Sequence, residues 1–290
     1  MNTTRRDLLA AAASIPLAAS LGACASTAPQ TAAPVTQPFK ISLAQWSLHR
    51  RLYGGTFVEA MAGRSREEFI RAMHEAPATA FRGTMDPIDF PVVARREFGI
   101  EAIEYVNRFY FPHAGDGAFF AELKRRCDGE GVTSVLIMCD DEGALGDPDD
   151  AKRAAAVTNH HKWVDAAAIL GCHSIRVNAQ SSGTPEEQAR LAADGLHRLG
   201  DYGGQHGINV IVENHGGNSS NGQWLANVMR LADHPRVGTL PDFGNFRVSD
   251  TERYDPYRGV EELMPFAKGV SAKCYDFDAD GNETTLDFRA

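Results

Sequence analysis

Short apolar segments alternate with longer amphipathic segments along most of the chain, and this alternation limits the possible fold more than any other feature. The apolar segments are rich in β-branched residues and have the length of buried strands: residues 40–46, 100–106, 132–139, 173–177, 209–213, 237–240 and 269–274. Between them lie segments that read as helices, at residues 54–82, 90–98, 117–129, 149–170, 185–202, 224–232 and 256–266. Strands that alternate with helices in this way form a parallel sheet, because each helix carries the chain back to the start of the next strand.

A TIM-type (β/α)8 barrel is the form that we expect for this sheet. A chain of 290 residues has the right length for one barrel. No G-x-G-x-x-G turn follows any expected strand, which removes the main support for an open, dinucleotide-binding sheet. An eighth strand is not recognisable before Ala290, so the expected barrel domain, residues 39–290, lacks its last strand at the C-terminus.

The first 38 residues do not share this pattern. Residues 1–23 contain Arg5 and Arg6 followed by an Ala-rich apolar segment that is too short to span a membrane, which predicts an export signal of the twin-arginine type. The segment that ends at Cys24 resembles a bacterial lipobox, so we expect a lipid anchor on Cys24 and a flexible tether over residues 24–38. A periplasmic or cell-envelope location follows, with the anchor as the sole membrane contact. The alternative is an Ala-rich tail without a signal.

The charge of the chain indicates a small-molecule partner. The formal net charge is -9, and no block of Lys or Arg interrupts the acidic balance. Binding to a nucleic acid backbone depends on a concentrated basic face. We therefore expect no nucleic acid partner, and the sequence leaves the oligomeric state open.

Polar residues follow nearly every expected strand. In a parallel barrel the carboxyl ends of the strands meet at one face, where the active site is built. The residues at these ends, in chain order, are Glu104, Asn107, Asp140, Asp141, Asn178, Glu213, His215, Asp242, Asn245 and Lys273. Their convergence predicts a polar site at this face of the barrel.

Several strings around these residues resemble the sugar phosphate isomerase/epimerase family, the xylose isomerase-like TIM barrels. The strings are GIEAIEYVN, SIRVNA, IVENHGG, GTLPDFGNF and VSAKCYDFDADGNET, and the resemblance runs from Phe39 to the end of the chain. The family implies a divalent metal (Mn, Mg, Co or Zn) that polarises a sugar carbonyl or hydroxyl while a carboxylate moves a proton at the adjacent carbon. Glu213 and Asp242 match two of its four metal ligands. Ser271 stands where the family has a His, and the fourth ligand, a Glu on the eighth strand, has no counterpart.

The resemblance thus implies a metal-dependent isomerase or epimerase that acts on a sugar or sugar derivative. Glu213 is the expected metal ligand and base, Asp242 the second ligand, and Lys273 the catalytic cation that holds an enediolate oxygen. The expected substrate contacts are Glu104, Asn178, His215 and Asn245. His215 can alternatively supply the missing metal nitrogen or only form local hydrogen bonds, and each carboxylate can instead have a structural role.

Two other functional classes are open at this point. A hydrolase or lyase on the same barrel would use the metal to activate water. A non-catalytic, truncated sugar-binding lipoprotein is the second class, because a barrel without its last strand exposes strand edges.

Overall fold

The computed structural model describes residues 39–288, and from Ile41 onward they belong to one compact unit. The expected export signal at residues 1–23, the lipid-anchor Cys24 and the tether at residues 24–38 lie outside the described residues. No helix in the described part of the chain is both long and apolar enough to cross a membrane.

Six parallel strands form one sheet in chain order. They are β1 (Leu43–Ala44), β2 (Ala102–Val106), β3 (Thr133–Met138), β4 (Ser174–Val177), β5 (Asn209–Glu213) and β6 (Val237–Leu240). Each strand pairs in parallel with its neighbours in the sequence, for example Ile175 with Val210 between β4 and β5. The sheet confirms the expected fold class. Within the described residues it is open, with β1 and β6 at its edges.

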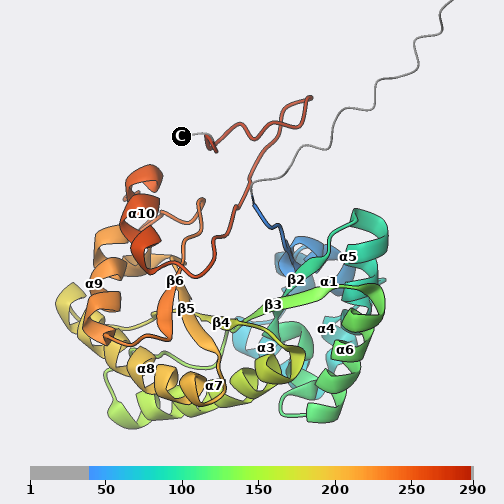
Figure 1. Ribbon diagram of the computed structural model, residues 1–290, viewed down its shortest axis with the longest axis horizontal. Coiled ribbons are helices and arrows are strands. Elements are labelled where there is room, and N and C mark those ends of the chain that lie inside the picture. The colour runs from blue at the N-terminus through green and yellow to red at the C-terminus, as the bar shows by residue number, and fades with distance from the viewer. Residues whose placement is uncertain (1–38, 289–290) are drawn as a thin grey trace, which may run out of the picture. The chain divides into compact units, whose positions relative to one another are not determined.

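The helices that connect the strands lie on the outer side of the sheet (Figure 1). They are α5 (Phe90–Phe98), α6 (Gly117–Glu130), α7 (Asp150–Leu170), α8 (Pro185–Gln205) and α9 (Gly222–Ala232), and α10 (Pro256–Leu263) follows β6. Between β1 and α5 the chain forms the shorter helices α1 (His49–Tyr53), α2 (Phe57–Met61), α3 (Arg66–Glu75) and α4 (Pro77–Ala80). Short 3-10 helices are η1 (Gln45–Leu48), η2 (Pro87–Asp89), η3 (Asn107–His113), η4 (Gly217–Ser220) and η5 (Met264–Phe266).

Local sequence signals explain where several of these helices begin and end. Ser65 and Glu68 form a capping box at the start of α3, in which each side chain accepts a hydrogen bond from the other residue's backbone amide. Gly99 and Gly171 end α5 and α7 in the left-handed conformation, which glycine adopts without a steric penalty. The continuous helical segment expected at residues 54–82 is instead divided into α2, α3 and α4. The division follows from Gly63, which has a φ of 79°, and from Pro77.

The expected strand at residues 269–274 is wrong. In place of a ladder, Ala267 and Ser271 make isolated parallel bridges with Thr239 and Asp242, respectively. The Ser271 amide donates to the Pro241 carbonyl, and the Phe243 amide donates to the Ser271 carbonyl. Pro241 lies between the bridged residues Thr239 and Asp242 and has no N–H to donate, so the ladder is interrupted where β6 would continue.

The first strand is shorter than the expected residues 40–46. It ends at Ala44, and Gln45 begins the 3-10 helix η1. The buried Gln45 side chain accepts a hydrogen bond from the Val106 amide and donates one to the Tyr110 hydroxyl. A side chain thus satisfies the backbone donor of β2 that a longer strand would have paired.

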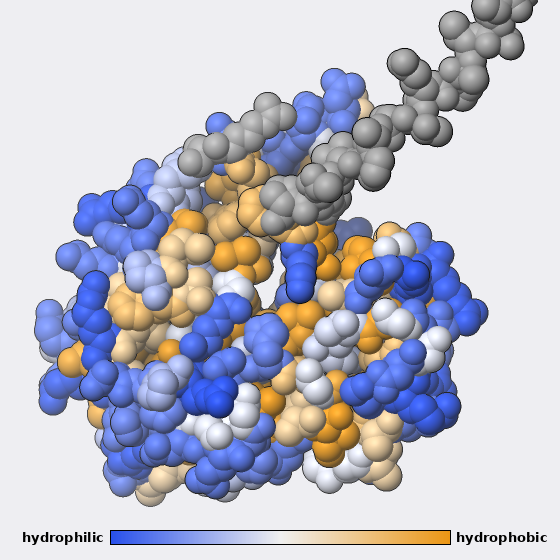
Figure 2. Space-filling model, in the orientation of Figure 1, coloured by the Kyte–Doolittle hydropathy of each residue, from blue (hydrophilic) through white to orange (hydrophobic). Residues whose placement is uncertain are grey.

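The two faces of the sheet have different environments. On the outer face Ile103, Ile175 and Val210 pack with the helices in the main hydrophobic core. On the inner face Leu136, Ile211 and Leu240 form a small separate cluster. Figure 2 shows one side of the molecule, where hydrophobic residues gather around a central hollow and hydrophilic residues cover the surrounding helices. The inner face therefore carries little apolar packing and has room for polar side chains.

We predict that Gly195→Ala destabilises the fold and that Gly204→Ala, on the same helix, does not. A Cβ at Gly195 would lie 1.9 Å from the Leu145 carbonyl oxygen, so α8 would have to move away from the loop after β3. Such overpacking costs about 3 kcal/mol. A Cβ at Gly204 meets nothing closer than 3.7 Å, and alanine there gains about 0.5 kcal/mol of helix propensity. Urea denaturation of the two variants tests this, and equal stabilities would contradict it.

Candidate active site

Polar side chains of three strands share the inner face of the sheet at its carboxyl end. Side chains alternate between the two faces of a strand, so Glu104 on β2, Arg176 on β4 and Glu213 on β5 lie on the same face as the inner apolar cluster. Arg176 is paired in register with Met138 on one side and Ile211 on the other. Arg176 and Glu213 are 4% and 5% exposed, so their charges must be matched inside the protein.

Arg176 occupies the centre of this polar group. One of its terminal nitrogens, Nη2, forms an ion pair with Glu213 Oε2, and the other, Nη1, lies 3.0 Å from Asp140 Oδ1. Burial disfavours the cation, but the carboxylates of Glu213 and Asp140 raise the pKa of Arg176 above its usual value. Its Nε is buried and has no hydrogen-bond partner among the described residues. The guanidinium is therefore a permanent positive charge beside Glu213.

Asp140 extends the network to a second arginine. Its carboxylate accepts a hydrogen bond of 2.9 Å from the Asn178 side chain and lies 3.6 Å from Arg108 Nη2. Burial alone would raise the pKa of Asp140, but Arg176 and Arg108 hold it well below its usual range. The Asn107 side chain bonds both the amide and the carbonyl of Asp140, which fixes the backbone at this point. Asp140 is thus held as an anion between two guanidinium groups.

Glu213, Asn245 and Lys273, which the sequence places in one site, are in contact. The Asn245 side chain donates a hydrogen bond of 2.7 Å to Glu213 Oε1. Its Oδ1 accepts a hydrogen bond of 2.9 Å from Lys273 Nζ. Both oxygens of Glu213 are therefore bonded, one by Arg176 and one by Asn245. The side-chain amide of Asn245 thus bridges Lys273 and Glu213.

Asp242 lies in a buried position beside this group. Its carboxylate accepts hydrogen bonds from the Gly244 amide and the Ser271 hydroxyl, each 2.9 Å long. Asn214 bonds the backbone amide and carbonyl of Asp242. Burial and the Glu213 charge raise the pKa of Asp242 to about 6, although Lys273 acts in the opposite direction. Asp242 thus retains a proton at a pH at which an exposed aspartate has lost it.

Glu104 and His215 lie at the border of the group. Burial raises the pKa of Glu104, and the Glu213 charge raises it further, against the opposing effect of a hydrogen bond from Ser42. No cation lies within ion-pair distance of Glu104 in the described part of the chain. The His215 residue is exposed, and its backbone amide donates to Ser219 Oγ. Desolvation lowers the pKa of His215, and the charges of Glu213 and Arg176 also act on it, so it lies close to the group.

The strand-end pattern of the sequence predicts the acidic members of this site but not Arg176, which lies between them. Arg176 lies inside the string SIRVNA, which was assigned as a buried strand. A signal was present, because Ser174, Arg176 and Asn178 are spaced by two residues and so share one face of that strand. Arg108 carried no such signal, because it lies in η3 and reaches Asp140 only through the fold. The substrate contact expected of Asn178 stays a prediction, and its amide group donates a hydrogen bond to Asp140.

We predict that Asp242 makes the fold less stable as the pH rises. In metal-free buffer the folded protein keeps the Asp242 proton up to about pH 6, whereas the unfolded chain loses it near pH 3.8. The free energy of unfolding therefore falls between these values by about 3 kcal/mol and changes no further from this residue above pH 6. Asp242→Asn removes this loss, so its stability relative to wild type should increase from pH 4 to pH 6 in denaturant titrations. A constant difference over this range would contradict the assignment.

Three similar crystal structures support the fold. The magnesium complex of a xylose isomerase-like TIM barrel protein from Mycobacterium smegmatis has a TM-score of 0.55 and 17% identity, and the match covers 84% of this chain and 78% of that one. The 3-keto-D-glucoside 4-epimerase from E. coli has a TM-score of 0.53 and 14% identity, with coverage of 64% and 73%. The D-psicose 3-epimerase from Clostridium cellulolyticum has a TM-score of 0.52 and 13% identity, with coverage of 64% and 67%.

The family is established by sequence. A search of curated proteins finds no match. The family model described as "Xylose isomerase-like TIM barrel" matches residues 92–266, which is more than half of the chain. The matched region runs from α5 to η5 and contains Glu104, Arg176, Glu213 and Asp242. The chain therefore belongs to the xylose isomerase-like TIM barrel family.

Proposed function

We propose that this protein is a sugar isomerase or epimerase that moves a proton at a carbon next to a carbonyl group. The observation that carries the proposal is a pair of inner-face carboxylates in different environments. Glu213 is bonded by the Arg176 guanidinium and the Asn245 amide, whereas burial and the nearby Glu213 raise the pKa of Glu104. Two carboxyl groups that differ in this way suit the roles of base and acid. Two of the similar structures are those of sugar epimerases, which supports the same substrate class.

The proposed reaction begins with proton removal by Glu213. The C–H electron pair moves toward the adjacent carbonyl, and negative charge develops on its oxygen. Lys273, which Asn245 holds close to Glu213, stabilises this enediolate oxygen as a positive charge that is already in place. Glu104 then returns a proton from its acid form. The substrate gains and loses one proton overall, so no oxidant or other reactant is needed.

The positions of the two carboxyl groups favour epimerisation. Glu104 lies on β2 and Glu213 on β5, with two strands between them in the sheet. We propose that the two groups reach a substrate bound at the carboxyl ends of the strands from different sides. Proton removal by one and return by the other inverts the carbon. His215 is proposed to bind a substrate hydroxyl with its exposed ring.

We expect Glu213→Gln to lower kcat by about 10²- to 10⁴-fold, because the amide cannot accept the proton. Proton NMR in D2O, with a panel of aldoses, ketoses and keto-sugars, measures both product formation and deuterium uptake at the reacting carbon. The control is Glu101→Gln, because Glu101 is exposed and pairs with Arg95 instead of the site residues. Undiminished exchange in Glu213→Gln would contradict the proposal. A product that has lost water would assign a lyase reaction to the same residues.

A divalent metal on Glu213 and Asp242 stays a prediction from the family, and the described residues do not fit it. Two carboxylates are present, but the described chain contains no group of three His, Cys, Asp or Glu side chains placed to hold a metal ion. Ser271, at the position of the family histidine, donates to Asp242. Arg176 already supplies a positive charge to Glu213, and its unpartnered Nε is a donor that calls for an acceptor. The proposed steps therefore use only the residues of this chain.

We predict that Mn²⁺ binds to the wild-type protein with a Kd weaker than about 1 mM, because two carboxylates beside a guanidinium provide too few ligands. Isothermal titration calorimetry measures the affinity. Arg176→Met removes the competing cation, so this variant should bind Mn²⁺ more tightly than wild type does. Micromolar binding to wild type that is lost in Asp242→Asn would contradict this prediction and establish the metal site.

The proposed location of the activity is the periplasm or cell envelope. It rests on the sequence of residues 1–24, with the paired arginines and Cys24. These residues lie outside the described part of the chain, so the location is independent of the site geometry.

A further inference from the structure

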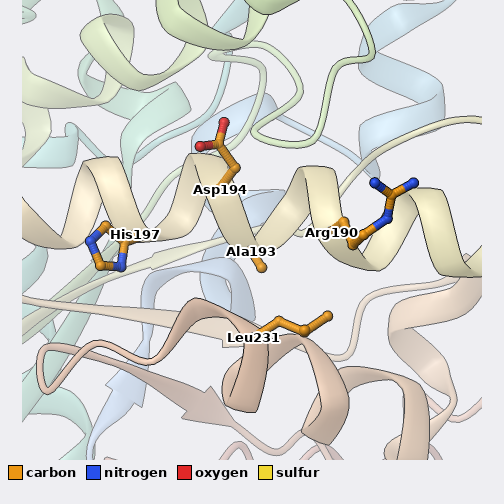
Figure 3. A pocket seen from close by; sticks show the side chains of 5 residues that line it. All are labelled: Arg190, Ala193, Asp194, His197 and Leu231. Carbon is orange, nitrogen blue, oxygen red and sulfur yellow. The ribbon is translucent and has the colours of Figure 1, made fainter.

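A cavity of about 580 Å³ lies between α3 and the loops that follow β3 and β4. We call it the α3 cavity. Helix α3 contributes Arg66, Arg71, His74 and Glu75 to its lining, and the two loops contribute Asp141 and Gln180. The space is open to solvent, and most of its lining residues are exposed. A second groove, of about 290 Å³, is lined by α8 and α9 alone and so has no connection with the inner face (Figure 3).

The α3 cavity adjoins the candidate active site through both loops. After β3, Asp140 bonds Arg176 in the site, and the next residue, Asp141, lines the cavity. After β4, Asn178 bonds Asp140, and Gln180 lines the cavity. A molecule bound at Glu213 and extended along these loops would therefore enter the α3 cavity.

Asp141 holds the wall between the two spaces. It has a φ of 64°, in the left-handed region that residues other than glycine rarely adopt. In this conformation its carboxylate bonds both Arg108 and Arg66, the latter at 2.9 Å. Strain of this kind is typical of functional sites, because the surrounding contacts must maintain it. The wall of the cavity is thus fixed by ion pairs on both sides.

Four polar side chains in the cavity are not used by the protein itself. The side chains of Arg71, His74, Glu75 and Gln180 are exposed and form no hydrogen bond or ion pair with another described residue. These side chains present a guanidinium, an imidazole, a carboxylate and an amide group, respectively, to a ligand. The His74 ring also stacks on Phe111 at 4.1 Å, which makes its face rigid. The cavity therefore has unused donors and acceptors beside a flat ring.

The chemistry of these groups identifies the ligand class. The positive charge of Arg71 offsets the negative charge of Glu75. Burial lowers the pKa of His74, which favours its uncharged form. A phosphate would meet the carboxylates of Glu67, Glu75 and Asp141 in the same cavity, with two arginines to offset them. A hydroxyl group both donates and accepts, so a ring with several hydroxyls can use all four side chains. The lining thus suits an uncharged sugar ring.

We propose that the α3 cavity is a second sugar subsite, which binds an uncharged ring joined to the ring that reacts at Glu213. This inference rests on the proposed function and narrows its substrate class. The substrate is a glycoside or disaccharide, in which the second ring lies between Arg71 on α3 and Gln180 on the loop after β4.

Isothermal titration calorimetry with glucose, glucose 6-phosphate, maltose, cellobiose and lactose tests this proposal. At least one disaccharide should bind tenfold or more tightly than glucose, and glucose 6-phosphate should bind no more tightly than glucose. Arg71→Met and Gln180→Ala should each weaken disaccharide binding by about tenfold through the loss of one or two hydrogen bonds. Both variants should leave glucose binding unchanged. Arg190→Met is the matched control, because Arg190 is an exposed arginine in the other groove.

Three results would overturn the subsite. They are affinities for all disaccharides no better than that for glucose, tightest binding of glucose 6-phosphate, or full disaccharide binding by both cavity variants. Arg71 and Gln180 are exposed, so unchanged melting temperatures should accompany the loss of affinity. The test is separate from that of the proposed function. If Arg71-dependent disaccharide binding occurs while Glu213→Gln retains proton exchange, the subsite stands and the assigned base is wrong.

Discussion

The buried guanidinium of Arg176 is the constraint on which the inner face depends. A cation without solvent must be paired, and removal of one partner from a buried pair costs about 3–5 kcal/mol. Glu213 and Asp140 supply the two negative charges, from the end of β5 and from the loop after β3. The ends of three elements are thereby fixed relative to one another. The proposed base is one of the anions that the fold requires, so its position is set by stability as well as by catalysis.

The pairing does not end at Asp140, because each added anion needs a further cation. Arg108 in η3 contacts both Asp140 and Asp141, and Arg66 on α3 contacts Asp141. Positive and negative groups therefore alternate from Glu213 to α3. The side chains from Glu213 to Asp141 are at most 14% exposed, whereas that of Arg66 is 53% exposed, so the outermost pair contributes less to stability than the inner ones. The series links a firmly held centre to a helix at the surface.

Much of this fold could be predicted from the sequence because its signals are local. Gly99 and Gly171 mark helix ends, and apolar β-branched runs mark the strands from β2 to β6. The strand expected at residues 269–274 failed because its pairing depends on another segment, in which Pro241 lacks the required donor. The approach of Asn245 to Glu213 followed from the strand-end rule of parallel barrels, whereas Lys273 joins them from a segment that is not a strand. The role of Arg176 could not be predicted from the sequence. Its partners, Glu213 and Asp140, come from distant segments that only the fold brings together.

Two adjacent residues explain how substrate recognition and base placement can share one loop. Beyond the end of β3 the backbone no longer alternates as in a strand, and the left-handed φ of Asp141 turns its carboxylate toward Arg66 and Arg108. Asp140 remains directed at Arg176. A contact made in the α3 cavity acts on the same short loop that holds the partner of the proposed base. Binding energy from a remote part of a substrate can in this way contribute to the orientation of the reacting groups, which is where such energy raises the rate.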